Sequence, residues 1–244
     1  MRRTHYTIEA SITKDIALVS DLHNFSYDGL LSALQEEKPD IIVVPGDMVE
    51  NAIGHPINTS FNLPGFTCLI SMAKIAPVYY SIGNHEGGMS DDNRTLLQEH
   101  GITLLDNSFV HAHGMCIGGL TSPLPYVKHH AERTPPPNLE FLSRYAAEEG
   151  FHLLLCHHPE HYPAHIRNTS VELTVSGHAH GGQWRLFGQD IYAPGQGLFP
   201  KYDAGLYTQG DTNMIVSRGI GNSLFPFRVN NPPEVILVEL RCGN

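Results

Sequence analysis

The chain has 244 residues, of which 41% are apolar and 16% are charged, and its formal net charge is −10 at pH 7. These values are typical of a folded globular protein, and the acidic balance argues against nucleic acid as a bulk partner, because no basic stripe offsets phosphate repulsion. No apolar run reaches the roughly 18 to 20 residues that cross a bilayer, and no apolar segment follows the basic Met1-Arg2-Arg3, so we expect neither a transmembrane segment nor a signal peptide.

The length suits one large core, and no linker or repeat divides the sequence, so residues 1–244 are expected to form a single domain. The four cysteines, at positions 68, 116, 156 and 242, show no metal-binding spacing, and three lie in apolar surroundings. Cysteine in such a setting is usually a small buried hydrophobe, and unpaired thiols favour a reducing, cytoplasmic location. Cys156 precedes His157, which leaves a redox-sensitive role open beside the simpler core role.

Short apolar runs rich in β-branched residues predict strands at 16–20, 41–44, 78–82, 153–156 and 171–175. Helices are predicted between them at 27–38, 63–76, 91–100 and 138–149, with Asp91 and Asn138 as capping residues. After Gly181 only strand patterns remain. The pattern indicates an α/β fold, a four-layer α/β/β/α sandwich of two mixed sheets with flanking helices.

Five short polar motifs come directly after these strand-like runs. They are Asp21-Leu22-His23, Gly46-Asp47, Gly83-Asn84-His85-Glu86, His157-His158 and Gly177-His178-Ala179-His180. Side chains at such strand ends converge at one edge of a sheet. Two divalent ions close together need a shared carboxylate with further oxygen and imidazole donors, and these motifs supply all of them. A site without thiolate suits Mn, Fe or Zn.

Each motif alone has a simpler explanation. Asp21-x-His23 could be a strand-end turn, Gly46-Asp47 an ordinary turn, and His178-x-His180 a polar strand end. Their combination, each behind a predicted strand, favours the metal site. The remaining histidines are expected to face solvent or to form local hydrogen bonds, with His158 as the candidate for supporting the ligands.

In this order the motifs resemble those of the calcineurin-like metallophosphoesterase superfamily, and the resemblance covers essentially the whole chain. It implies that Asp21, His23 and His180 hold one ion, that Asn84, His157 and His178 hold the other, and that Asp47 bridges them. It also implies that His85 is no ligand but the acid that assists the leaving oxygen.

The resemblance implies a two-metal phosphoester hydrolase, a phosphodiesterase or pyrophosphatase, in which a metal-bridging hydroxide attacks phosphorus and the substrate is a small anionic phosphoester. The later stretches 177–183, 197–202 and 217–221 resemble a subgroup of bacterial phosphodiesterases and UDP-diacylglucosamine pyrophosphatases. The second motif departs from the usual Gly-Asp-x-x-Asp because its final acid is Glu50, which puts in doubt only the geometry around the ligands. A rival function is a non-catalytic scaffold of the same fold that binds proteins.

Two segments could decide the choice of substrate. The proline-rich stretch 121–137 is long enough to be a functional loop. The stretch 196–207 carries Leu198 and Phe199 beside a single Lys201. Either this second stretch packs on its own side chains, or it forms an apolar lip for a lipid-linked substrate or a peripheral membrane contact. The oligomeric state cannot be predicted from these patterns.

Overall fold

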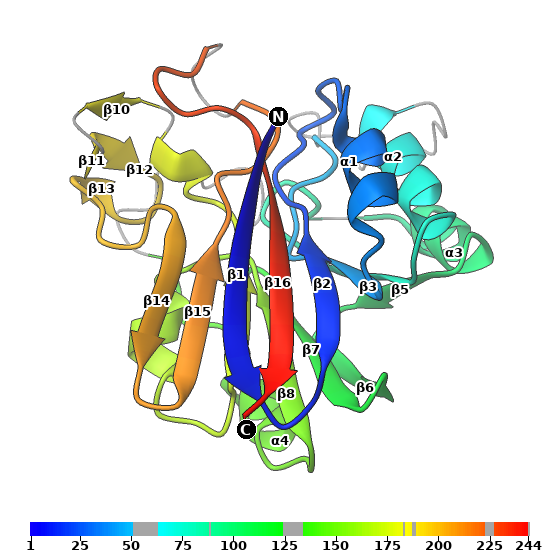
Figure 1. Ribbon diagram of the computed structural model, residues 1–244, viewed down its shortest axis with the longest axis vertical. Coiled ribbons are helices and arrows are strands. Elements are labelled where there is room, and N and C mark those ends of the chain that lie inside the picture. Colours follow the sequence, from blue (N-terminus) through cyan, green and yellow to red (C-terminus); the bar gives the residue numbers. More distant parts are fainter. Residues whose placement is uncertain are drawn as a thin grey trace.

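Two six-stranded mixed sheets pack face to face in the computed structural model (Figure 1), which describes residues 1–50, 63–87, 89–123, 134–182, 184–186, 189–222 and 227–243. The first sheet has the order β1-β16-β2-β3-β4-β5 and the second β14-β15-β9-β8-β7-β6. The strands of the first sheet are β1 (Arg2–Ala10), β16 (Glu234–Cys242), β2 (Lys14–Leu18), β3 (Ile41–Val44), β4 (Val78–Ser81) and β5 (Ile102–Leu105). Those of the second are β14 (Gly205–Gln209), β15 (Thr212–Val216), β9 (Leu173–Ser176), β8 (Phe151–Cys156), β7 (Met115–Leu120) and β6 (Ser108–Ala112).

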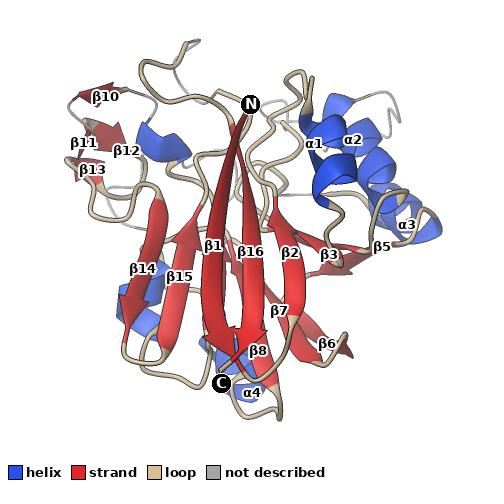
Figure 2. Cartoon of the chain, viewed as in Figure 1, coloured by secondary structure: helices blue, strands red, loops and turns tan. Residues whose placement is uncertain are grey.

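Helices cover the outer faces of both sheets (Figure 2). They are α1 (Leu30–Glu37), α2 (Pro64–Ala73), α3 (Asp91–Glu99) and α4 (Leu139–Tyr145), with a short π-helix at Tyr162–Ile166 and a 3₁₀ turn at His180–Gly182. Two small two-stranded sheets follow, β10 (Arg185–Leu186) with β11 (Gln189–Asp190), and β12 (Tyr192–Ala193) with β13 (Gly197–Leu198). Within the described residues, no helix combines the length and apolar character that crossing a bilayer requires.

Alternation along the buried strands builds three apolar layers. Ile16 and Leu18 of β2 point between the sheets, whereas Ala17 points to the core under the helices that cover the first sheet. Successive side chains of a strand face opposite sides, so a strand buried on both faces needs a continuous apolar run. A third cluster packs α4 on the second sheet through Phe141 and Tyr145. The predicted four-layer sandwich is therefore confirmed.

The predicted helices and buried strands agree with the structure to within a few residues. The predicted strand at 171–175 lies slightly later, at Leu173–Ser176, and helix α4 ends several residues before the predicted Glu149. The stretch 196–207 contains two strand segments, since Gly197–Leu198 forms β13 and Gly205–Gln209 forms the edge strand β14, which pairs with β15. Residues 124–133 of the predicted functional loop lie outside the described residues.

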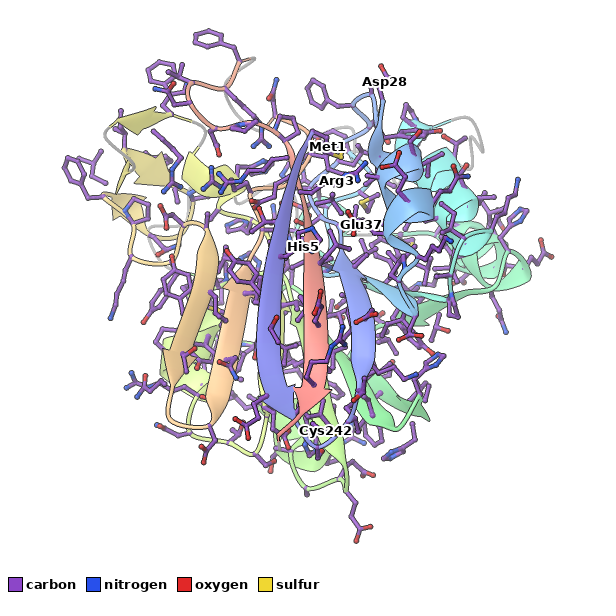
Figure 3. The ribbon with its side chains drawn as sticks, in the orientation of Figure 1. Met1, Arg3, His5, Asp28, Glu37 and Cys242 are labelled. Atoms are coloured by element: carbon purple, nitrogen blue, oxygen red, sulfur yellow. The ribbon has the colours of Figure 1, made fainter. Side chains whose placement is uncertain are left out.

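The outermost strand of the first sheet is tied to a helix by an exposed ion cluster, of which Arg3, His5 and Glu37 are labelled in Figure 3. Arg3 of β1 donates to Glu36 at 2.6 Å and to Glu37 at 3.2 Å, both on α1, and His5 lies 3.8 Å from the same Glu37 carboxylate.

All four cysteines are free, and three of them are buried.

The strand directions bring the polar motifs to one edge of the molecule. Strands β2, β3 and β4 run parallel to one another, as do β7, β8, β9 and β15. The strands β2 and β15 of the two sheets both point toward the upper edge in Figure 1. The carboxyl ends of both parallel sets therefore lie at this edge.

Candidate metal centre

Backbone hydrogen bonds extend the sheets into the loops that carry the motifs. Asp21 N donates to Gly46 O at 3.1 Å, and His23 N donates to Asp47 O at 3.1 Å, so the first two motifs lie side by side. Between the sheets, Gly221 N donates to Asp21 O at 2.7 Å. The motifs are thus joined by main-chain bonds as well as by their side chains.

Most of the predicted ligands adopt a left-handed backbone conformation that non-glycine residues rarely use. The φ angles are 53° at Asp21, 50° at His23, 57° at Asp47, 66° at His178 and 51° at His180. Such conformations are held by the surrounding structure and cluster at functional sites. Here they turn the chain sharply at the strand ends, where the side chains converge.

One group of donors combines the first and last motifs. Ligand-type atoms of Asp21, His23 and His180 lie within 4.8 Å of one another, and all three residues are buried. The two Nε2 atoms of His23 and His180 are 3.0 Å apart, and His180 Nε2 is 3.5 Å from Asp21 Oδ1. Asp21 Oδ1 also accepts the backbone N–H of His178 at 2.9 Å, which fixes the carboxylate between both strands.

A second group combines Asp47 and His157 of two further motifs with His178 of the last motif. Ligand-type atoms of Asp47, His157 and His178 again lie within 4.8 Å of one another. His157 Nε2 is 3.0 Å from Asp47 Oδ2, and His23 Nε2 of the first group is 3.8 Å from the same oxygen. Asp47 therefore lies between the two groups, while Asn84 is buried at the end of β4. The structure thus brings six of the seven predicted ligands into these two groups.

The protonation states suit metal binding at some positions and oppose it at others. Burial, with neighbouring histidines, holds the pKa of His178 and His180 well below its usual value, which leaves neutral imidazoles. Burial would also lower the pKa of His157, but the carboxylates of Asp47 and Asp21 outweigh it and raise the pKa to about 9. Bound cations would have to displace that proton.

The donor set fits divalent cations. It offers carboxylate, amide and imidazole groups on buried residues, and the Nε2 atoms of His23 and His180 lie only 3.0 Å apart. Such nitrogen and oxygen donors are those that Zn, Mn and Fe prefer. All of them lie at the edge where the two sheets meet.

His85 and Glu50 form a hydrogen-bonded pair beside the two groups. Glu50 Oε1 accepts from His85 Nδ1 at 3.1 Å, while Oε2 of the same carboxylate accepts from His23 Nδ1 at 2.8 Å. His85 Nε2 is 3.8 Å from Asp47 Oδ2, and the side chain is 14% exposed. One carboxylate thus orients both rings with their Nε2 atoms toward the site.

Charge around His85 favours its protonated form. Burial alone would lower its pKa, but the carboxylates of Asp47 and Glu50 outweigh burial and raise the pKa above the usual value. The hydrogen bonds from His23 and His85 in turn lower the pKa of Glu50, against the opposing effect of burial. The pair is therefore suited to hold a proton at His85 Nε2.

Several supporting residues were not identified from the sequence. Glu86 is fully buried and accepts backbone N–H groups of the Asp47 loop. Arg228 donates to Arg218 O at 2.8 Å and lies 3.5 Å from His180 Nδ1. The only available signal for Glu86 was its place directly after His85 in a turn rich in N–H groups. Arg228 lies 48 residues from His180 in the sequence, so no local pattern connects them.

His158 lies beside the second donor group, where ligand-type atoms of His158, Glu160 and His178 are within 4.8 Å of one another. Its Nε2 is 2.6 Å from Ser122 Oγ, and its Nδ1 is 3.6 Å from Glu160 Oε1. Its ring also packs edge-on against His178, with centroids 4.3 Å apart. His158 therefore supports the wall behind His178, while His157 points to Asp47.

Comparisons with known proteins identify the family that this chain resembles. Residues 14–182 match the family model described as calcineurin-like phosphoesterase. The chain is 31% identical to Phosphodiesterase YaeI of Escherichia coli K12, over 84% of this chain and 72% of that protein. It is 27% identical to the metallophosphoesterase YkuE of Bacillus subtilis 168, over 99% and 86%. A solved structure aligns over 84% of this chain and 90% of its own with a TM-score of 0.50 at 13% identity, which indicates a similar fold alone.

Proposed function

The chain belongs to the calcineurin-like phosphoesterase family, and from this premise we propose that it is a two-metal phosphoester hydrolase that prefers phosphodiesters or pyrophosphates to monoesters. The observation that carries the proposal is the meeting of two buried His and Asp groups, with Asp47 between them, at one sheet edge. The preference for diesters is supported by the relative named as a phosphodiesterase.

In this proposal each donor group holds one divalent ion, Mn, Fe or Zn. The first ion is assigned to Asp21, His23 and His180, the second to Asn84, His157 and His178, and Asp47 is shared by both. When bound, such ions lower the pKa of water to near neutrality and stabilise charge on phosphoryl oxygens. The protein itself buries the ligand side chains, favours the neutral form of His178 and His180, and orients His23 through Glu50.

His85 supplies the proton for the leaving oxygen. Its Nδ1–H donates to Glu50, so the ring cannot turn freely, and its Nε2 faces the space beside Asp47. The raised pKa favours the protonated ring, and partial exposure leaves Nε2 within reach of a substrate. A departing alkoxide would take this proton as the ester bond breaks.

The test compares hydrolysis of bis-p-nitrophenyl phosphate and p-nitrophenyl phosphate by the purified protein with added Mn²⁺. We expect turnover of the diester at a higher kcat/KM than the monoester, and loss of both activities on chelation. Cleavage of the monoester alone would contradict the diester preference.

The rival function, a scaffold that binds proteins without catalysis, predicts a different result in a simpler measurement. We expect about two ions per chain by elemental analysis after supplementation with Mn²⁺ or Zn²⁺, as a pair of cooperating ions requires. Fewer than one ion per chain, together with no hydrolysis of either substrate, would favour the scaffold.

A lipid-linked substrate is the narrower proposal. Leu198 and Phe199 are 69% and 65% exposed, and they belong to the segment that follows the last metal motif. Adjacent exposed apolar side chains of this size are a feature of surfaces that contact an apolar ligand or a lipid layer. The proposed substrate class is therefore an anionic phosphoester that carries an apolar tail.

A further inference from the structure

Glu86 is a fully buried carboxylate that belongs to neither donor group. Its Oε2 accepts the backbone N–H of Asp47 at 2.9 Å and of Gly83 at 2.8 Å. Its Oε1 accepts those of Met48 at 2.5 Å and Val49 at 3.2 Å. One side chain thus satisfies four main-chain donors, which are the N–H groups of two different strand-end loops.

The two loops hold each other through carboxylates in both directions. Asp47 N donates to Glu86, while Asp47 Oδ1 accepts the backbone N–H of His85 at 2.9 Å. Gly83 permits this close approach, because a Cβ at that position would overlap Asp47 Oδ1. The reciprocal bonds fix both the backbone and the carboxylate of Asp47.

This support is needed at Asp47 more than at an ordinary loop residue. Its φ of 57° is a left-handed conformation that is unfavourable for a residue with a side chain, so the neighbouring structure has to impose it. The three successive N–H groups of Asp47, Met48 and Val49 all point at Glu86. All of these bonds lie within the chain and involve no cation.

We propose that Glu86 is a positioning residue that holds Asp47 in its ion-sharing pose before any ion binds, so that the centre is already formed in the metal-free protein. The inference rests on the proposed function only in assigning Asp47 to both ions. Preorganisation of this kind raises metal affinity, since binding then does not have to order the loop.

Substitution of Glu86 by Gln tests the proposal with almost no change of shape. Each carboxylate oxygen accepts two N–H groups, so either orientation of the amide places its NH₂ against two donors. We expect E86Q to weaken Mn²⁺ binding at least tenfold in a chelator-competition titration. E86D keeps the charge but is shorter by one methylene, and should weaken binding less than E86Q.

Glu172 provides the matched control, because its carboxylate also accepts a backbone N–H, from His152 at 2.9 Å, but belongs to none of the donor groups of the metal centre. E172Q should bind Mn²⁺ like the parent. Equal Mn²⁺ affinity of folded E86Q and the parent would overturn the proposal, with folding checked by circular dichroism.

Amide hydrogen exchange of the unmodified protein gives a second test that does not depend on how the variants fold. After chelation, the amides of Asp47, Met48, Val49 and Gly83 should remain protected, and Mn²⁺ should add little. Rapid exchange without Mn²⁺ that becomes slow only with Mn²⁺ would show that the ions order the loop, and would overturn the inference. Neither experiment uses a phosphoester, so the inference can hold even if the proposed hydrolase activity fails.

Discussion

The backbone N–H of His85 donates to the carboxylate of Asp47, yet substitutions should separate the roles of the two residues. Asp47→Asn is expected to reduce metal loading of both positions, because the carboxylate lies near His23 and His157 of the two groups. His85→Ala should retain both ions and lower kcat by about 10²- to 10⁴-fold, the usual contribution of a general acid. Elemental analysis and diester turnover on the same samples would check both results.

The position of His85 allows a direct check of its assignment as the acid. His85, His23 and Asp47 have ligand-type atoms within 4.8 Å of one another, so a ligand role for His85 is sterically open. Loss of an ion from His85→Ala would show that His85 is a ligand and not the acid. The structurally matched check is His152→Ala, since His152 is a buried histidine whose ring contacts Glu172 instead.

Residue types and motif order were enough to select the candidate ligands, but not the contacts that orient them. Glu50 was read only as a departure from the usual Asp, whereas its two oxygens contact Nδ1 of His23 and of His85. That double contact depends on the fold, because His23 lies 27 positions and His85 lies 35 positions from Glu50 in the sequence. The role of Glu86 could not be predicted either, because its partners are main-chain N–H groups, which carry no sequence signature.

Among the elements, the buried strands were the easiest to predict and the edge strands the hardest. Ile41–Val44 is apolar throughout because both of its faces are covered. Strand β1 at Arg2–Ala10 carries polar residues on an exposed edge, and its partner β16 lies more than 220 residues away. A local signal exists, because Tyr6, Ile8 and Ala10 alternate with polar residues and pack on the core between the sheets. It is weaker than a continuous apolar run, and the pairing with a strand so distant in the sequence leaves no local trace.

The segment 196–207 combines both of the interpretations that its sequence left open. Gln196 and Tyr202 exchange two hydrogen bonds, and the Tyr207 hydroxyl donates to Asp203, so part of the segment packs on itself. Leu198 and Phe199 nevertheless remain the most exposed large apolar residues of the described chain. The packed part holds the exposed part in place.

Replacing Leu198 and Phe199 together with Ser should spare hydrolysis of a small diester but weaken capture of an acylated phosphodiester. Two large apolar side chains contribute roughly 1.5 to 3 kcal/mol each when fully buried, so losing half of that contact reduces affinity about tenfold or more. KM for both substrates, with vesicle co-sedimentation, would measure the effect. Leu139→Ser, an exposed apolar residue of α4, is the control. A folded double variant that treats both substrates like the parent would exclude the apolar lip.

For the whole molecule, His157 should couple stability, metal binding and pH. Its pKa is raised from 6.5 to about 9 in the metal-free protein, so its charged form stabilises the fold below about pH 6.5 and this contribution is lost as the pH rises through 9. Metal binding requires the neutral ring, so its affinity should rise about tenfold per pH unit over the same range for this one proton.

Thermal unfolding between pH 6 and 9.5, with and without Mn²⁺, would measure this coupling. The midpoint of the chelated protein should fall with rising pH, while the increase produced by Mn²⁺ should grow. In His157→Gln both trends should weaken. A Mn²⁺-induced shift that does not change with pH would contradict the assignment of His157 as a ligand.

Strand β16 lies between β1 and β2, pairing parallel with the first and antiparallel with the second. During synthesis the ribosome therefore releases β1 and β2 long before the segment that separates them exists. If these two early strands paired directly, that hairpin would have to open again to admit residues 234–242. The loop carrying Asp21 follows β2, so the centre reaches its final geometry only after residues 234–242 have joined the sheet. On this order of events, the nascent chain can bind an ion at the complete centre only after β16 has been inserted.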